Sequence, residues 1–190
     1  DLFSFPSNAQ LLSFDVFRFV DRLERKYRSL PLHGVTSSNE QFGALVGALL
    51  AQRLGLPGAD PKALIAAQHK YVARRILERD VPEANVKFHA FPYTFRSADE
   101  IPLAYPFYVK PVKAAYSVLA RRVDSFEQLQ QHMTFHPWEK YIIKRLVRPF
   151  NDVVRKLTDF DVDAHWMLAE ELIDGQQVNV DGVAINGEVH

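Results

Sequence analysis

The 190-residue sequence contains no cysteine and carries no formal net charge. Without thiols it has no disulfides, no cysteine-based zinc sites and no cysteine nucleophile. Its 23 basic and 23 acidic side chains balance, so no overall field favours nucleic acid or an anionic membrane. The longest apolar run, residues 44–54, is interrupted by Gly47 and Gln52 and is shorter than the roughly 18 residues of a spanning helix. We therefore expect a soluble globular protein that binds neither nucleic acid nor membrane.

Apolar patterning in the first third of the chain predicts alternating helix and strand. Residues 9–28 repeat apolar side chains at helical spacing and predict an amphipathic helix. Residues 32–36 are short and apolar, which predicts a buried strand. Ser37 and Glu40 have the spacing of a capping box, which would open a helix over 41–54. Glycine and proline are dense in residues 55–61, so we place a domain boundary there.

The chain after this boundary predicts an α+β arrangement. Pro61 is suited to the first position of a helix over 61–79, with a break near Gln68 and an end at Val81 and Pro82. Ser125, with Gln128 three residues later, predicts another helix start. A second helical segment, 138–157, contains Pro149, which should kink or divide it. Short apolar or alternating segments predict strands at 86–91, 106–111, 117–123 and 166–173.

The C-terminal residues predict a hairpin. Residues 178–185 alternate β-branched and polar side chains, and Asn186–Gly187 is a strong turn signal. Residues 188–190 would begin the return strand. Three residues make a short strand, so we expect this sequence to be part of a longer protein.

Charged residues stand at the ends of two apolar strands. Lys110 ends the strand 106–111, and Glu170 and Glu171 follow the apolar residues 167–169. Lys70 lies in the helical stretch 61–79. Burying an unpaired charge is costly, so each of these groups needs a partner of opposite sign. Strand ends beside a crevice are where such folds place ligands; the alternative is that each charge is paired locally or solvated.

The order and spacing of four segments resemble the ATP-grasp superfamily, of the carboxylate–amine ligase and carbamoyl-phosphate synthase type. The resemblance runs from about Gly34 to His190. Its first piece is Gly-Leu-Pro-Gly at 55–58 with Pro61, and its second is His69–Lys70, followed by a helix and Val81–Pro82. The others are Tyr-Pro-Phe-Tyr-Val-Lys-Pro at 105–111 and Ala-Glu-Glu-Leu-Ile-Asp-Gly-Gln-Gln at 169–177.

The resemblance implies an incomplete ATP-grasp fold that combines α/β and α+β parts. Residues 1–58 would be the C-terminal part of a Rossmann-like pre-ATP-grasp domain. Residues 59–190 would be the ATP-grasp domain, with its N-terminal subdomain and the start of the second. It would be truncated before the metal-binding strands, so no metal ligand is expected within this chain.

The resemblance also implies how ATP is held. Lys70 and Lys110 would bind the α- and β-phosphates, and the loop 112–117, with Lys113 and Ser117, would close over them. Glu170 would lie beside the adenine amino group. The adenine edge would meet the backbone at Leu172, and the ribose would meet residue 177. The full ATP-binding set is Lys70, Lys110, Lys113, Ser117, Glu170, Glu171, Leu172, Ile173 and Gln177.

The implied reaction is that of an ATP-dependent ligase forming C–N bonds. A carboxylate attacks the γ-phosphate to give an acyl phosphate, which an amine or similar nucleophile then attacks. Mg²⁺ would bridge the phosphates, with ligands expected beyond residue 190. The partners would be ATP and small carboxylate and amine substrates, in the cytoplasm, with a homo-oligomer as an open possibility. No catalytic residue is assigned.

Two departures from the family pattern support a rival hypothesis. The loop 112–117 contains no glycine, although backbone N–H groups must approach phosphate closely. Gln177 stands where the family has glutamate. The rival is a non-catalytic nucleotide-binding or interaction module derived from this fold, and a third possibility is a helical scaffolding domain without nucleotide.

Three weaker signals have ordinary explanations. Asp159, Asp161, Asp163 and Glu170 share the spacing of an EF-hand loop, but Ala164 stands where glycine is needed. His132 and His136 have the i, i+4 spacing of metal ligands, without an identifiable third ligand. Basic clusters at 74–75, 121–122 and 140–148 suggest solvated surfaces, and the last lies in the helical segment 138–157, which could instead dock a second subunit.

Overall fold

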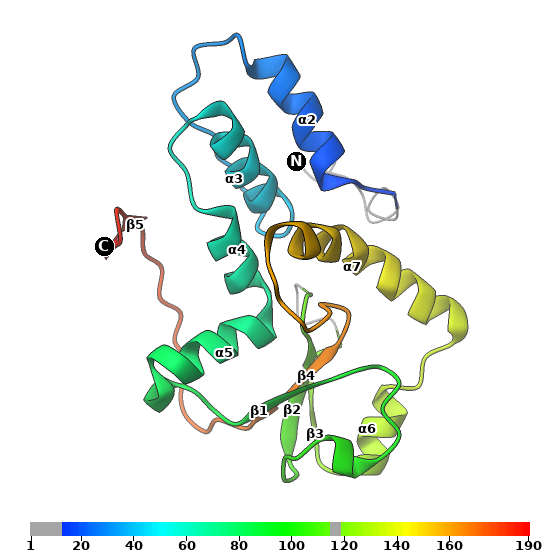
Figure 1. The fold of residues 1–190 in the computed structure, drawn as a ribbon. Coiled ribbons are helices and arrows are strands. Elements are labelled where there is room, and N and C mark those ends of the chain that lie inside the picture. Colours follow the sequence, from blue (N-terminus) through cyan, green and yellow to red (C-terminus); the bar gives the residue numbers. More distant parts are fainter. Residues whose placement is uncertain (1–12, 115–118) are drawn as a thin grey trace.

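The computed structural model describes residues 13–114 and 119–190 (Figure 1). No helix in these two ranges is both long and apolar enough to cross a membrane. The helices are α2 (Val16–Tyr27), α3 (Gly43–Leu54), α4 (Pro61–Gln68), α5 (Lys70–Asp80), α6 (Phe126–His132) and α7 (Pro137–Leu157), with short 3-10 turns η1 (Pro82–Ala84) and η2 (Ala98–Glu100). The strands are β1 (Phe88–Phe91), β2 (Phe107–Pro111), β3 (Arg121–Val123), β4 (Met167–Glu171), β5 (Ala184–Ile185) and β6 (Glu188–Val189).

Four strands form an antiparallel sheet in the order β1-β4-β2-β3. The last of them in the sequence, β4, therefore lies in the interior of the sheet, between β1 and β2. Glu170 of β4 stands opposite Phe88 on one side and Tyr108 on the other, and Lys110 stands opposite Leu168. Residues opposite each other in a sheet share one face. Lys110, Leu168 and Glu170 accordingly lie on the same face.

The sheet separates two hydrophobic cores. Leu168 belongs to the larger core, which α2, α3, α4 and α7 build on one side, whereas Met167 and Ala169 belong to the smaller core on the other side. This is the alternation expected of a strand with both faces covered. The smaller core includes Leu129 of α6, which packs near β3 (Figure 1). Glu170, on the Leu168 face, lies on the side that α5 covers.

The expected strand at residues 32–36 is wrong. These residues have no regular structure, and Leu32 and Val35 are only half-buried. A short apolar run becomes a strand only where another strand offers its backbone, and residues 13–58 of the structure contain helices and loops alone. The next helix begins at Gly43, because the side chain of Asn39 accepts the N–H groups of residues 41–43 instead of a Ser37–Glu40 capping box.

Buried His69 produces the predicted break between α4 and α5. Its side chain accepts the N–H of Val72 and caps α5, and its Nε2 lies 2.9 Å from the carbonyl oxygen of Val162. The predicted start at Pro61 and the predicted stop at Val81 and Pro82 are confirmed, with α5 ending at Asp80 and so one residue beyond the predicted range 61–79. Lys70 is therefore the first residue of a helix and is held there by its capped N-terminus.

Most of the later predictions are confirmed with shorter elements. Ser125 caps α6 by accepting the N–H of Gln128, and the strands predicted at 86–91, 106–111 and 166–173 are present as β1, β2 and β4. The strand expected from residue 117 begins only at Arg121; residues 115–118, including Ser117, lie outside the described part. α7 continues through Pro149 as one helix, so this proline does not divide it.

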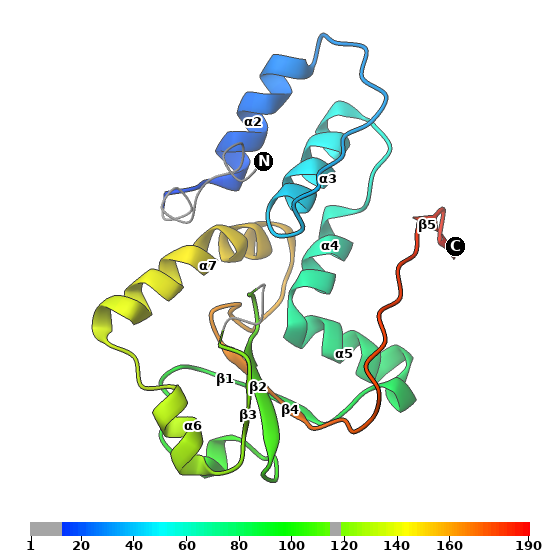
Figure 2. The same cartoon turned by 180° about the vertical axis from the view of Figure 1, so that it is seen from behind.

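The predicted C-terminal hairpin forms around Asn186 and Gly187, both with positive φ. Its strands β5 and β6 have two residues each, so the long strand expected over 178–185 is wrong. Residues 173–190 are exposed, and both views place the hairpin apart from the helices (Figures 1 and 2).

Candidate anion-binding site

Glu170 is the centre of a charged cluster between α5 and the sheet. Only 5% of this residue is exposed. Its two carboxylate oxygens accept separate partners: Arg74 Nε of α5 at 2.8 Å and Lys110 Nζ of β2 at 2.5 Å. Burial by itself raises the pKa of Glu170, but the hydrogen bonds from Arg74 and Lys110 outweigh it and hold that pKa below its usual value. Glu170 is therefore ionised at neutral pH.

Lys70 begins α5 next to this carboxylate. Its Nζ donates to the carbonyl oxygen of Ala114 at 2.9 Å, and its backbone N–H donates to the carbonyl of Val112. Burial, together with repulsion from Lys110, lowers the pKa of Lys70 to about 8, against a smaller opposing attraction from Glu170. The N-terminus of α5 is thus joined to the chain that follows β2.

Lys113 extends the cluster beyond Lys70. Its Nζ donates to Gln68 Oε1 at 2.8 Å and lies 4.7 Å from the centre of the Phe150 ring. Burial and repulsion from Lys70 lower the pKa of Lys113 to about 8, with Glu40 opposing this shift. Both lysines are held at positions that disfavour their own charge.

These side chains form a chain of cations that starts at one buried carboxylate: Arg74 and Lys110 bond to Glu170, Lys70 lies within the electrostatic reach of Glu170, and Lys113 lies beyond Lys70 and within reach of Glu40. The cations outnumber these two carboxylates, and repulsion among the lysines is one cause of the lowered pKa values of Lys70 and Lys113. A polyanionic ligand beside the lysines would relieve this repulsion and raise those pKa values again. The arrangement is chemically suited to phosphate groups, which compact ammonium groups bind as point charges.

The structure brings together only part of the predicted ATP-binding set. Lys70, Lys110, Lys113 and Glu170 form the cluster. Glu171 instead points to exposed Lys87, with 3.8 Å between Oε1 and Nζ. Leu172 is half-buried, Ile173 and Gln177 are exposed, and no hydrogen bond or ion pair in the described ranges joins these three to the lysines. Ser117 lies outside those ranges.

Arg74 is the member of the Glu170 cluster that the sequence analysis missed. We expected it in an exposed basic cluster with Arg75, but its guanidinium bonds to buried Glu170 and also to Asn85 Oδ1 at 3.2 Å. The available signal was its spacing, since residue 74 lies one turn after Lys70 on the same side of the helix. Arg75, by contrast, is exposed and pairs with Glu78.

The competing metal sites are not formed. Glu170 lies within strand β4 and is held by two cations, so it does not close an EF-hand loop. His132 ends α6, whereas His136 precedes α7, and the two therefore do not share one helical face. Across residues 13–114 and 119–190, no three acidic or histidine side chains gather in a way that could hold a metal ion.

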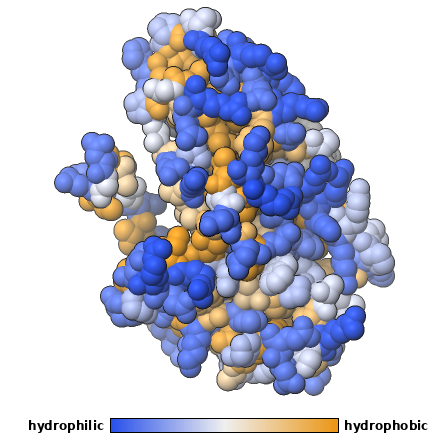
Figure 3. Space-filling view, in the orientation of Figure 1, coloured by the Kyte–Doolittle hydropathy of each residue, from blue (hydrophilic) through white to orange (hydrophobic). Residues whose placement is uncertain are grey.

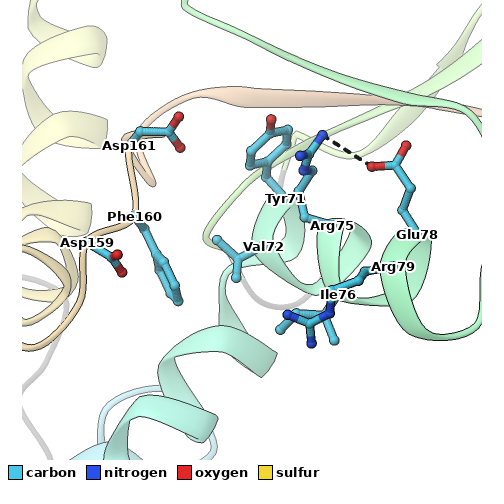
Figure 4. A pocket seen from close by; sticks show the side chains of 9 residues that line it. All are labelled: Tyr71, Val72, Arg75, Ile76, Glu78, Arg79, Asp159, Phe160 and Asp161. Carbon is cyan, nitrogen blue, oxygen red and sulfur yellow. Dashed lines mark ion pairs between the residues drawn. The ribbon is translucent and has the colours of Figure 1, made fainter.

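A hollow lies elsewhere on α5. It has a volume of about 650 Å³, with a floor of Tyr71, Val72, Ile76 and Phe160 and a charged rim (Figure 4). Hydrophobic residues are also visible at the surface near α5 (Figure 3). None of the clustered lysines lines this hollow. The candidate site rests on charge and geometry at Glu170 and not on cavity size.

Comparison with known proteins identifies the class. No family model and no curated protein sequence matches the chain. Among solved structures, however, there is a similar one: the match covers 94% of this chain, with a TM-score of 0.63 and 26% sequence identity. The chain is related to the ATP-grasp enzymes and has a partial ATP-grasp fold.

More particularly, the similar structure is the crystal structure of an L-amino acid ligase from Bacillus licheniformis. The match covers 36% of that ligase, so the chain spans about a third of its length. The resemblance to ATP-grasp proteins stated from the sequence motifs is thereby confirmed, as is the expected partial fold. The structural similarity also supports a relationship of this chain to the general family of ligases.

Proposed function

We propose that this chain is the ATP-binding part of a ligase that activates a carboxylate as an acyl phosphate for attack by an amine. The observation that carries this proposal is the excess of half-buried cations beside Glu170 and at the N-terminus of α5, with pKa values of about 8 at Lys70 and Lys113. The structural similarity to an L-amino acid ligase supports the same reaction class and suggests amino acids as the substrates. We place the end of the pre-ATP-grasp domain at residue 58 and the ATP-grasp domain at 59–190.

The residues of the cluster have distinct tasks in this proposal. Lys70 and Lys110 would neutralise the α- and β-phosphates, and Lys113 would approach them from the loop 112–117. Glu170, fixed by Arg74, would position the Lys110 ammonium and lie beside the adenine amino group. Bound ATP supplies the phosphoryl group of the acyl phosphate. The backbone at Leu172 and Ile173, with the side chains of Glu171 and Gln177, would meet adenine and ribose.

Magnesium does not fit the described side chains, because no three acidic or histidine residues among them gather in a way that could hold a metal ion. The charge that the phosphates bring into the site is balanced by the ammonium groups alone in this part of the protein.

The experiment is a calorimetric titration with Mg-ATP of the wild type and of Lys110→Met and Lys70→Met. Lys62→Met is the matched control, since Lys62 is exposed on α4. Removing one buried phosphate contact should weaken binding by about tenfold or more, because each tenfold step corresponds to about 1.4 kcal/mol. Unchanged affinity in Lys110→Met would overturn the proposal.

The second candidate, a non-catalytic nucleotide-binding module, is favoured by one specific observation: the loop 112–117 has no glycine. Both candidates predict Mg-ATP binding through Lys110, but only the ligase predicts turnover. A ligase should therefore release ADP when Mg-ATP is supplied with amino acid mixtures. Tight binding without ADP release in any mixture would select the module.

A further inference from the structure

A second basic site lies on α7 and shares no lining residue with the Glu170 cluster. A groove of about 390 Å³ runs between this helix and the turn that leads into β4. Its helix side presents Lys144, Arg145, Arg148 and Arg155, and its turn side presents Asp163 and His165. Three of the helix residues are spaced at i, i+4 and i+11, so they lie along one stripe of α7.

The charges of the groove are only partly balanced. Arg148 and Arg155 share one carboxylate, that of Asp152. The Asp163 carboxylate already accepts two hydrogen bonds, from Asn151 Nδ2 at 2.5 Å and from the backbone N–H of His165 at 2.7 Å. Lys144 and Arg145 have no acidic partner among the residues that the structure describes.

Unsatisfied polar atoms point to the same place. Within the described ranges, three buried side-chain atoms have no hydrogen-bond partner: Arg145 Nε, His165 Nε2 and Tyr93 Oη. Arg145 and His165 line the groove, and the Tyr93 ring stacks on the His165 ring at 4.6 Å between centroids. Buried polar atoms are nearly always satisfied, and leaving one unpaired costs about 1–3 kcal/mol. Two such atoms on residues that line one groove, Arg145 Nε and His165 Nε2, are therefore a signal of a binding site.

From this geometry we infer that the α7 groove binds a small molecule through a phosphate dianion. Two unpaired cations, Lys144 and Arg145, match the two charges of a phosphate monoester. Guanidinium N–H groups bind phosphate oxygens in a forked geometry, and His165 adds a ring nitrogen. Asp152 and Asp163 repel a long polyanion, which favours a small ligand over nucleic acid.

The groove is adjacent to the Glu170 cluster through the chain itself. The N–H of Lys113 donates to the carbonyl of Ala164 at 3.2 Å, and the N–H of Val112 donates to that of Trp166 at 2.9 Å. The turn that carries His165 is thus hydrogen-bonded to the backbone of Lys113. The inference nevertheless rests on the groove alone and does not depend on the proposed function.

The test is a titration with inorganic phosphate, followed by the ¹H–¹⁵N signals of Arg145 Nε and of the His165 ring. It is done in the Lys110→Met variant, so that phosphate at the Glu170 cluster does not interfere. We expect saturable shifts of these signals with millimolar affinity and a loss of about tenfold or more in Lys144→Gln combined with Arg145→Gln. Lys62→Gln is the matched control and should bind as before.

The single variant Lys144→Gln is expected to fold even if the double variant does not, because Lys144 is exposed. It should weaken phosphate binding by at least about threefold, which corresponds to roughly half of a 1.4 kcal/mol step. Parallel arms use AMP, whose binding would support a phosphate monoester, and succinate at the same pH. No shift with phosphate, an undiminished shift in the double variant, or equal affinity for succinate would each overturn the inference. Tighter binding of a single-stranded oligonucleotide than of AMP would also overturn it. Loss of Mg-ATP binding in Lys110→Met bears on the proposed function alone.

Discussion

Replacing Glu170 by glutamine tests the charged cluster at its centre. The substitution keeps the size and the hydrogen-bonding oxygen of the side chain but removes its negative charge. Arg74 and Lys110 would then face each other without a counter-ion, and their side chains are only 17% and 23% exposed. Removing one partner of a buried ion pair is strongly destabilising, because the other charges remain in a poorly solvated place.

The expected loss of unfolding free energy is about 2–4 kcal/mol, slightly below the usual 3–5 kcal/mol because glutamine still accepts a hydrogen bond and Lys110 reaches some water. For a chain of this length, each 1 kcal/mol lowers the melting temperature by roughly 2–4 °C. Glu170→Gln should therefore melt roughly 4–16 °C below the wild type.

The effect has a defined pH dependence. The pKa of Glu170 is lowered in the folded protein, so its ionised form contributes stability above the unfolded pKa of about 4.3. That contribution is lost as the pH falls through the lower, folded pKa. The difference between wild type and Glu170→Gln should accordingly be full at pH 7 and should shrink below about pH 4.

The assay is urea unfolding at about pH 7 and about pH 3, on either side of the predicted change, followed by circular dichroism. Glu171→Gln is the matched control, since this neighbouring glutamate is half-exposed and lies 3.8 Å from exposed Lys87. Exposed pairs contribute about 0–1 kcal/mol, so the control should be nearly as stable as the wild type. If Glu170→Gln were no less stable than Glu171→Gln, the cluster would not be the buried ion network argued here.

Three further predictions follow from the same contacts. First, Mg-ATP affinity should fall as the pH rises above about 8, because Lys70 and Lys113 lose their protons there. Calorimetry in two buffers should show that the protein takes up protons when it binds Mg-ATP. A constant affinity from pH 7 to 10 would contradict this prediction. Second, without ligand, the sign is opposite. The unfolded state holds more protons between about pH 8 and 10.5, so Lys70 and Lys113 add stability as the pH rises. Lys113→Met should remove its own share of this rise in thermal melts, and an unchanged pH dependence in this variant would contradict the prediction. Third, His69→Ala should lower the free energy of unfolding by about 2–4 kcal/mol, because the helix cap and the buried packing of His69 are lost. Asparagine can still cap a helix, so His69→Asn should lose less stability in the same urea unfolding experiment. Equal losses in the two variants would argue against capping by His69.

Several helix boundaries were predicted correctly because they depend on residues close to each other in the sequence. The start of α4 at Pro61, the stop of α5 near Pro82 and the capped start of α6 at Ser125 depend on residues within one turn of each other. The hairpin turn at Asn186–Gly187 has the same local origin, in residues that tolerate positive φ. Such features can be predicted from sequence because their contacts are close along the chain.

The strand ends of the candidate site were also visible in the sequence, since a lysine and a glutamate at the ends of apolar strands require partners. The sequence did not say which partners. Arg74 meets Glu170 across 96 positions of the chain, and Lys113 meets Gln68 across 45. The antiparallel placement of β4 between β1 and β2 brings Glu170 to Lys110 and to Arg74 of α5, and the packing of the α4–α5 junction against the chain after β2 brings Gln68 to Lys113.

Residues 32–36 show a case in which tertiary structure overrides the local preference of the sequence. Their composition favours a strand, but a strand is completed by hydrogen bonds to a neighbour, and residues 13–58 supply none. The unsatisfied atoms of the α7 groove likewise exist only because distant segments, around Tyr93, Arg145 and His165, are packed against one another. Capping and turn formation are decided by neighbours in sequence, whereas strand pairing, burial of charge and the balance of cations against Glu170 are decided by which segments share space.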